Sequence, residues 1–191
     1  MNKELLSKTI KHIEDNGFSN WNTLVEIANN KQTIEDIWYS KVKSNLIKYF
    51  NANLSDNWQH NDCKVWYLKG YSSSSLGVWF ENFHIFSVWS SNEQFDNQKT
   101  REIFQTKSCN KIYDAFDRID KRFEGEYKLR ELGNFSFQTE LDGNYDADTI
   151  SYFAGTRTED FCSQLIRKIE KFTNDIEITE LFRTINESTK R

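Results

Sequence analysis

The sequence has 191 residues, 28% of them charged and 15% aromatic, and its formal net charge is -4 at pH 7. This composition excludes general disorder, and so small a net charge does not by itself indicate a polyanion-binding protein. The length predicts a single domain, 1–191, that can bury a core without metals or disulfides.

The chain carries three widely spaced cysteines, Cys63, Cys109 and Cys162, and no signal-peptide pattern follows its first residue. An odd number of cysteines at such spacing favours reduced thiols, so we expect a cytoplasmic protein. The longest apolar runs are far shorter than the roughly 20 residues that a membrane-spanning helix needs. We therefore expect no membrane segment.

Apolar residues at helical spacing predict three helices in residues 1–52. Gly17 stands where the first helix would end, and Ser19 or Asn20 could cap the second. Together the three helices would form an N-terminal helical lobe, and residues 51–62, which are rich in turn formers, would connect it to the rest. The apolar stripes are Leu6, Ile10 and Ile13; Trp21, Leu24, Val25 and Ala28; and Ile34, Trp38, Val42, Leu46 and Tyr49.

The segment from Lys64 to Trp89 alternates aromatic and β-branched residues at a period of two. This pattern is typical of half-buried strands, and the short links within it suit hairpin turns better than crossovers. We predict a three-stranded antiparallel meander around which the rest of the chain is organised. Its strands would span Lys64–Tyr71, Leu76–Glu81 and Phe83–Trp89.

Helical and extended patterns alternate after the meander. Beyond a polar loop at Ser90–Asn97, a single apolar stripe predicts a helix over Asn110–Phe123. The alternation that starts at Phe135 predicts a strand, and Gly143 marks a turn that would join it to a second strand over Thr149–Ala154.

Two helices are predicted at the C-terminal end. Thr156 and Glu159 have capping-box spacing at the start of the first, and the second would span about Asp175–Glu187. The full pattern predicts an α+β fold: a helical lobe at 1–52, then, within 62–191, an antiparallel sheet of about five strands with helices packed on one face. The last two apolar stripes are Phe161, Leu165, Ile169 and Phe172, and Ile178, Leu181, Phe182 and Ile185.

Two acidic motifs are candidate metal sites. Oxygen donors alternate from Asp142 to Asp148 as at the start of a calcium loop, but Ala147 and Phe153 stand where such a loop needs glycine and glutamate. Glu126-Tyr127-Lys128 is a Glu-x-Lys triplet near a possible strand, which leaves a metal-dependent nuclease open as an alternative. We predict no metal ligand and no cofactor.

The histidines give little support for catalysis. His84 could act with Glu81 as a general acid and base, although a strand histidine that is satisfied by its neighbour is commoner. Cys63 lies far from His84 in the sequence, and no local signature indicates a Cys-His nucleophile. We predict no catalytic residue and therefore a protein that is not an enzyme.

Single-stranded nucleic acid, and RNA in particular, is an alternative ligand. Trp66, Tyr67 and Tyr71 interleave with Lys64 and Lys69, so bases could stack on the rings while the ammonium groups meet phosphates. Rings at both parities of a strand, however, usually mean that both faces of the sheet are covered. This interpretation therefore ranks behind protein binding.

The aromatic residues exceed what a small core needs, and exposed tryptophan and tyrosine are the residues that anchor protein interfaces. We expect a protein-binding modulator whose partner is another protein or a ribonucleoprotein. The absence of proline and the scarcity of alanine suggest an AT-rich bacterium or phage, which suits an immunity protein or an anti-CRISPR-like inhibitor of a host defence nuclease. The candidate binding residues are Trp66, Tyr67, Lys69, Tyr71, Trp79 and Trp89.

Overall fold

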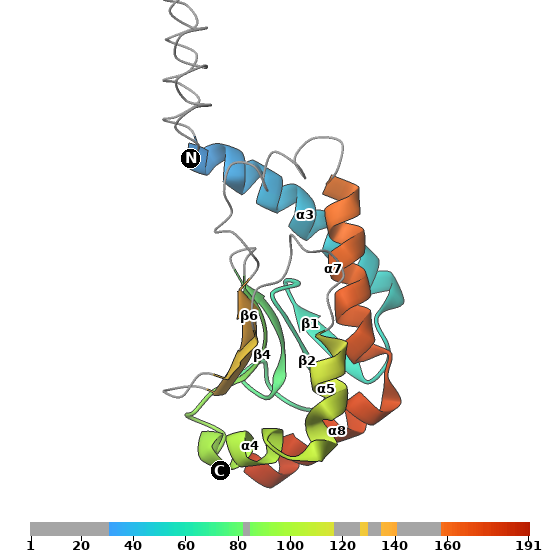
Figure 1. Ribbon diagram of the computed structural model, residues 1–191. Coiled ribbons are helices and arrows are strands. Elements are labelled where there is room, and N and C mark those ends of the chain that lie inside the picture. The colour runs from blue at the N-terminus through green and yellow to red at the C-terminus, as the bar shows by residue number, and fades with distance from the viewer. Residues whose placement is uncertain (1–30, 82–84, 117–126, 130–134, 141–157) are drawn as a thin grey trace, which may run out of the picture.

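The computed structural model describes residues 31–81, 85–116, 127–129, 135–140 and 158–191. These residues form an antiparallel sheet and a layer of helices that packs against one of its faces (Figure 1). The α+β class and the placement of helices on one face are thereby confirmed. The predicted first two helices, within residues 1–30, lie outside the described residues.

The sheet has six strands among the described residues, one more than the predicted number, in the order β1-β2-β3-β4-β6-β5. Four strands follow one another as a meander, and β6 then pairs with β4 while β5 forms the other edge. The strands are β1 Trp58–Asn61, β2 Val65–Leu68, β3 Gly77–Glu81, β4 Ile85–Ser90, β5 Tyr127–Leu129 and β6 Phe135–Glu140. The three predicted strands of the meander correspond to β2, β3 and β4.

The predicted connection over residues 51–62 is wrong in detail. Helix α3, Lys31–Asn53, continues into it, and β1 occupies its second half. Trp58 is 1% exposed and donates a hydrogen bond from Nε1 to Thr179 Oγ1 at 3.0 Å. The short polar strand β1 is therefore stabilised by its pairing with β2 and by the burial of one ring. Neither of these produces a periodic pattern of apolar residues in the sequence.

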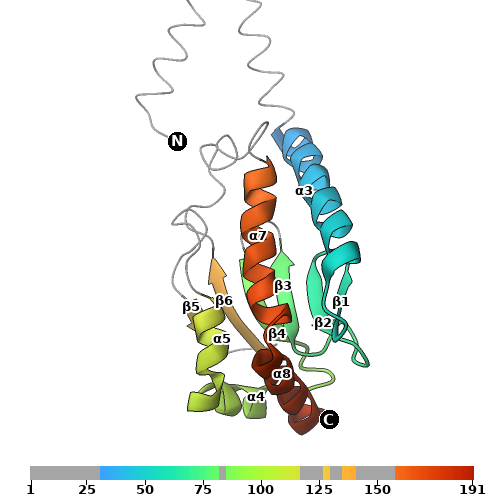
Figure 2. The same cartoon turned by 90° about the vertical axis from the view of Figure 1, so that its right-hand side faces the viewer.

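The predicted third helix is confirmed as α3, which packs along α7, Thr158–Thr173 (Figure 2). The rings of Trp38 and Phe161 have centroids 5.0 Å apart, and Trp38 Nε1 donates a hydrogen bond to Thr158 Oγ1 at 3.2 Å. Farther along the pair, Tyr49 Oη donates to Glu170 Oε1 at 2.5 Å. The C-terminal part of the predicted lobe thus joins the same layer as the later helices.

Two short helices follow β4. Helix α4, Asn97–Phe104, was not predicted, since its buried side chains include Asn97 and Thr100, and it begins at an Asp96 cap that accepts from Lys99 N. A 3-10 turn at Lys107–Cys109 then leads into α5, Asn110–Ala115. Helix α5 ends at Ala115 with Phe116 as its C-cap, and residues 117–123 of the predicted helix over Asn110–Phe123 lie outside the described residues.

The last two predicted helices are confirmed as α7 and as α8, Ile176–Thr189. Asp175 caps α8 by accepting hydrogen bonds from two backbone N–H groups. Asn186, with no exposed surface, accepts from Leu76 N at 2.8 Å and donates to Leu76 O at 3.4 Å, which ties α8 to the link between β2 and β3. The predicted strand over Thr149–Ala154, its turn at Gly143 and the cap at Thr156 lie outside the described residues.

The core lies between the sheet and the helices. Phe86, Phe116 and Phe172 form a triangle of rings with centroids 5.3–5.8 Å apart. Lys168 on α7 is 1% exposed, with its Nζ 3.5 Å from Phe116 O and 5.2 Å from the centroid of the Phe86 ring. None of the described helices combines the length and the apolar character needed to cross a membrane.

Candidate functional site

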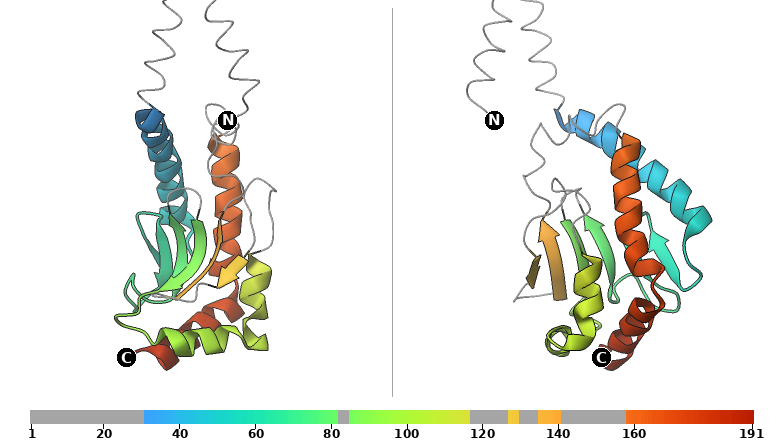
Figure 3. Two further views of the ribbon diagram at one scale, coloured as in Figure 1. Left: turned by 60° about the vertical axis from the view of Figure 1, so that its left-hand side comes forward. Right: turned by 45° about the vertical axis from the view of Figure 1, so that its right-hand side comes forward.

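Strand alternation divides the aromatic residues of the meander between two faces. One face lies against the helices and contributes Trp66, Val78, Phe80, Phe86 and Val88 to the core, each at most 2% exposed. Positions of the other parity belong to the opposite face, which we call the open face because no described helix packs on it (Figure 3, left). This division determines which of the candidate binding residues lie on the open face.

Three of the six candidate binding residues lie together on the open face. Tyr67, Trp79 and Trp89 are all half-buried. The rings of Trp79 and Trp89 are in edge contact, with centroids 4.5 Å apart and an interplanar angle of 62°. Edge-to-face contact orients each ring against the other, so the pair is a rigid apolar surface.

Gly77 lies between Tyr67 and Trp89 in one row across the sheet, because it pairs with both of them. A Cβ atom at Gly77 would lie 2.7 Å from Trp66 O and 3.3 Å from Tyr67 Cβ. Glycine therefore permits the close approach of β2 and β3 in the row that holds both rings.

Trp66 is not part of this surface, which corrects its assignment as a binding residue. It has no exposed surface, and its ring packs on the helix side against Phe50, with centroids 5.2 Å apart. The reason is geometric, since Trp66 and Tyr67 are consecutive residues of one strand and so point to opposite faces.

Lys69 and Tyr71 lie where β2 gives way to the link with β3. Lys69 is exposed, whereas Tyr71 is half-buried and packs against the edge of the core. Tyr71 Oη donates to Glu187 Oε1 at 3.4 Å, and burial together with that carboxylate raises the pKa of the Tyr71 phenol. Tyr71 is thereby engaged with α8, and Lys69 is left as a charged group at the end of the strand.

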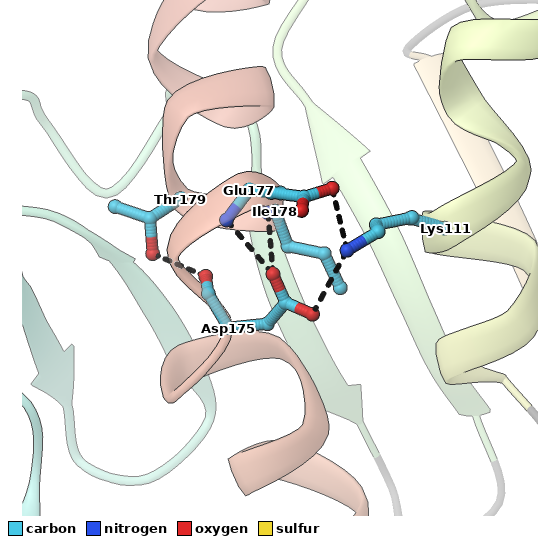
Figure 4. Close-up of polar contacts among 5 residues, drawn as sticks. All are labelled: Lys111, Asp175, Glu177, Ile178 and Thr179. Carbon is cyan, nitrogen blue, oxygen red and sulfur yellow. Dashed lines mark hydrogen bonds and ion pairs between the residues drawn. The ribbon is translucent and has the colours of Figure 1, made fainter.

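A second polar region is a cleft of about 530 Å³ between α5, α7 and α8. Lys111 Nζ lies 2.5 Å from Glu177 Oε2 and 3.7 Å from Asp175 Oδ2, and Asp175 Oδ1 accepts from the N–H groups of Glu177 and Ile178 (Figure 4). The hydrogen bond to Glu177 raises the pKa of Lys111. These contacts fix the start of α8 to α5, and we assign the cleft a structural role.

A third group joins a cysteine and a histidine that the sequence did not connect. Cys63 Sγ lies 3.8 Å from His60 Nδ1, and His60 Nε2 lies 3.1 Å from Asn51 Oδ1. The sequence predicted no pairing of Cys63 with a histidine, although His60 lies only three residues before it. A hairpin turn between His60 and Cys63 brings their side chains together, and the missed strand β1 hid that turn.

Most residues of the two candidate metal motifs lie outside the described part of the chain. Glu126 and the alternating donors from Asp142 to Asp148 lie outside the described residues, while Tyr127 and Lys128 form part of β5. In the part of the chain that is described, no three histidine, cysteine or acidic side chains are grouped so that they could hold a metal ion.

Neither a protein-family profile, a curated protein nor a solved structure matches the chain.

Proposed function

We propose that the chain is a non-enzymatic, cytoplasmic binding protein that holds another protein on its open face. The observation that supports this proposal is the cluster of Tyr67, Trp79 and Trp89 on the sheet face opposite the helices. Tryptophan and tyrosine are enriched among the residues that dominate binding energy at interfaces, because they bury a large apolar area at little conformational cost.

The charges of the open face favour a protein over a nucleic acid. Among the open-face positions of β1 to β4, whose side chains are described, none is basic, and Lys69 lies just beyond the end of β2. Binding to single strands needs a basic groove that follows the phosphates beside the stacking rings. The two rows of open-face positions are Asn61, Val65, Trp79, Ser87, Gln138 and Lys128, and Gln59, Tyr67, Gly77, Trp89 and Ser136.

The ring cluster has polar side chains, Gln59 and Asn61, at the β1 end of its two rows, and a protein interface likewise has a polar rim beside its apolar centre. The role that we propose is inhibition of a host defence nuclease or immunity against a toxin, because protein binding without catalysis is sufficient for either. Single-stranded RNA binding is the second candidate, supported by the stacking surface of Trp79 and Trp89.

The test is affinity capture from a lysate of the native host, with and without nuclease treatment. The full chain is compared with a Trp79→Ala/Trp89→Ala double variant and with Ile37→Ala, a matched control that removes a 56% exposed apolar side chain from α3. We expect one protein partner that survives nuclease treatment, is retained by Ile37→Ala and is lost with the double variant.

Two results would contradict the proposal. Loss of all bound material after nuclease treatment would indicate the RNA-binding alternative. A partner that the double variant retains as well as the wild type would place binding elsewhere on the molecule. Circular dichroism of the double variant must match that of the wild type, so that loss of binding reports on the face and not on unfolding.

A further inference from the structure

The turn between β1 and β2 brings three polar side chains from three different segments into one line. Asn51 comes from the last turn of α3, His60 from β1 and Cys63 from the turn itself. The contacts are 3.1 Å between Asn51 Oδ1 and His60 Nε2, and 3.8 Å between His60 Nδ1 and Cys63 Sγ. A nucleophile beside a base that a third group orients is the arrangement of an assisted nucleophile.

The hydrogen bond to Asn51 determines which ring nitrogen of His60 carries the proton. A carbonyl oxygen only accepts, so His60 Nε2 must donate to Asn51 Oδ1. In the neutral ring, Nδ1 then has a free lone pair, and this atom faces the Cys63 thiol. Neutral His60 is therefore set up to receive the thiol proton.

The turn that carries the thiol has an unfavourable backbone. Asp62 and Cys63 adopt φ values of 55° and 50°, a region that residues other than glycine rarely occupy. The turn is closed by the Lys64 N to Asn61 O hydrogen bond at 3.0 Å, and the ion pair between Lys43 and Asp62, at 2.8 Å, holds its outer side. Such strain lowers the free energy needed to open the turn and expose a thiol that is 4% exposed when it is closed.

The other two cysteines provide an internal comparison. Cys109 and Cys162 are also buried, and their thiols contact backbone carbonyls, Ile103 O at 3.4 Å and Val42 O at 3.9 Å. Burial raises the pKa of Cys63 to about 12 and the pKa of each of the other two to about 11. Without help from a base, Cys63 would thus be the least reactive of the three.

We propose that Cys63 is a covalent modification site for small soft electrophiles of the α,β-unsaturated carbonyl class, with His60 as the base and Asn51 as a positioning residue. The sulfur adds to the β-carbon and forms an S–C bond, while the carbon–carbon double bond becomes single. The thiol proton passes to His60 Nδ1 and from there to the α-carbon, so nothing is released and no oxidant is needed. This site is independent of the open face.

The experiment measures modification of the folded full-length protein by N-ethylmaleimide, with the rate at each cysteine followed by peptide mass spectrometry. We expect Cys63 to react about 10-fold or more faster than Cys109 and Cys162, the gain being of the kind that general-base assistance provides. His60→Gln should remove this lead, because glutamine can contact Asn51 but cannot accept the thiol proton.

A matched pair of asparagine variants tests the positioning role. Asn51→Ala should slow modification of Cys63 severalfold, whereas Asn53→Ala, an exposed asparagine in the same helical turn that bonds to Tyr49 O, should not. Both substitutions lie at the surface, so they keep the proposal testable if His60→Gln fails to fold. An equal effect of the two variants would overturn the assignment of Asn51.

The pH profile of the wild type separates base assistance from mere exposure. Burial lowers the pKa of His60 from its ordinary value of 6.5. If His60 is the base, the rate of Cys63 modification should therefore rise as the imidazole loses its proton and become constant near or below pH 6.5. An unassisted thiol would instead react tenfold faster with each pH unit up to its own pKa. Among the described residues, the titratable groups near the pair include Lys43, Asp62, Tyr39 and Lys64, and the first two are paired with each other. A profile that keeps rising, or modification of Cys63 no faster than of the other cysteines, would overturn the proposal.

Discussion

The two faces of the sheet carry aromatic residues at adjacent positions of the same strands, yet the rings on the two faces differ in how deeply they are buried. Trp66 has no exposed surface beneath the helices, whereas Tyr67, the next residue, is half-buried on the open face. The same contrast separates Phe80 from Trp79 and Val88 from Trp89. A ring on the helix side contributes to stability through full removal from water, and a ring on the open face keeps contact area for a partner.

The comparison also shows how the helix layer is attached. Trp58 and Asn186 form buried hydrogen bonds between the sheet and α8, to Thr179 and to the backbone of Leu76. Buried polar groups are costly unless they are paired, so these bonds specify one arrangement of α8 on the sheet. No described helix is attached to the open face in this way, so its rings keep exposed area for another molecule.

The largest expected effect is that of Trp66→Ala. Removal of a fully buried ring that packs against Phe50 leaves a cavity, and we expect a loss of about 3–5 kcal/mol in the free energy of unfolding. Urea denaturation measures it. Trp66→Phe should cost clearly less, because Trp66 Nε1 is buried and finds no hydrogen-bond partner among the described residues. A loss for Trp66→Ala below that for Trp89→Ala would break the distinction between the faces.

Gly77→Ala should have the next largest effect, although it only adds a methyl group on the open face. The new Cβ would lie 2.7 Å from the backbone oxygen of Trp66, so the two strands must move apart. We expect a loss of about 1–3 kcal/mol in the free energy of unfolding, measured by the same urea titration. Wild-type stability would show that the approach of β2 and β3 is not as tight as the geometry indicates.

Trp89→Ala should cost less, about 1–2 kcal/mol, because the ring is half-buried and its main loss is the edge contact with Trp79. Its effect on partner affinity should exceed its effect on stability, since hot-spot residues lose 2 kcal/mol or more on truncation. Isothermal titration with the captured partner gives the affinity. If Trp89→Ala lowers the free energy of unfolding by more than it weakens the free energy of binding, the main role of Trp89 is to stabilise the fold, as that of the core residues is.

The smallest effect concerns the exposed ion pair at the tip of the β1–β2 turn. The hydrogen bond from Lys43 holds the pKa of Asp62 below its ordinary value of 3.8. A carboxyl whose pKa is lowered by folding stabilises the folded state above its unfolded pKa, and this contribution is lost as the pH falls through its folded pKa. The urea midpoint of Asp62→Asn should therefore fall less than that of the wild type between neutral pH and a pH below 3.8. Equal falls would mean that the pair contributes nothing.

Periodicity was sufficient for the elements with continuous apolar stripes. The stripe that includes Trp38 and Val42 predicted α3, and the alternation from Lys64 to Trp89 predicted β2, β3 and β4. Elements held by other means were missed. Strand β1 depends on pairing and on the burial of Trp58, and α4 buries Asn97 and Thr100, so neither has an apolar repeat.

The candidate site was half predictable for the same reason. Alternation by itself places Trp66 and Tyr67 on opposite faces, but it does not say which face the helices will cover. Once the helices are seen to lie on the side of Trp66, the set reduces to Tyr67, Trp79 and Trp89. The link between His60 and Cys63 could have been suggested by their spacing of three, had the turn between them been recognised.

The sequence by itself determined the α+β class, the long helices and strands β2, β3 and β4, because local periodicity records which side of each element is apolar. Tertiary structure alone decided that β6 pairs with β4, that α7 and α8 cover the face of Trp66 rather than that of Tyr67, and that Asn51 reaches His60. Those choices depend on contacts between residues far apart in the chain, and their free energy is gained only when the whole core packs at once.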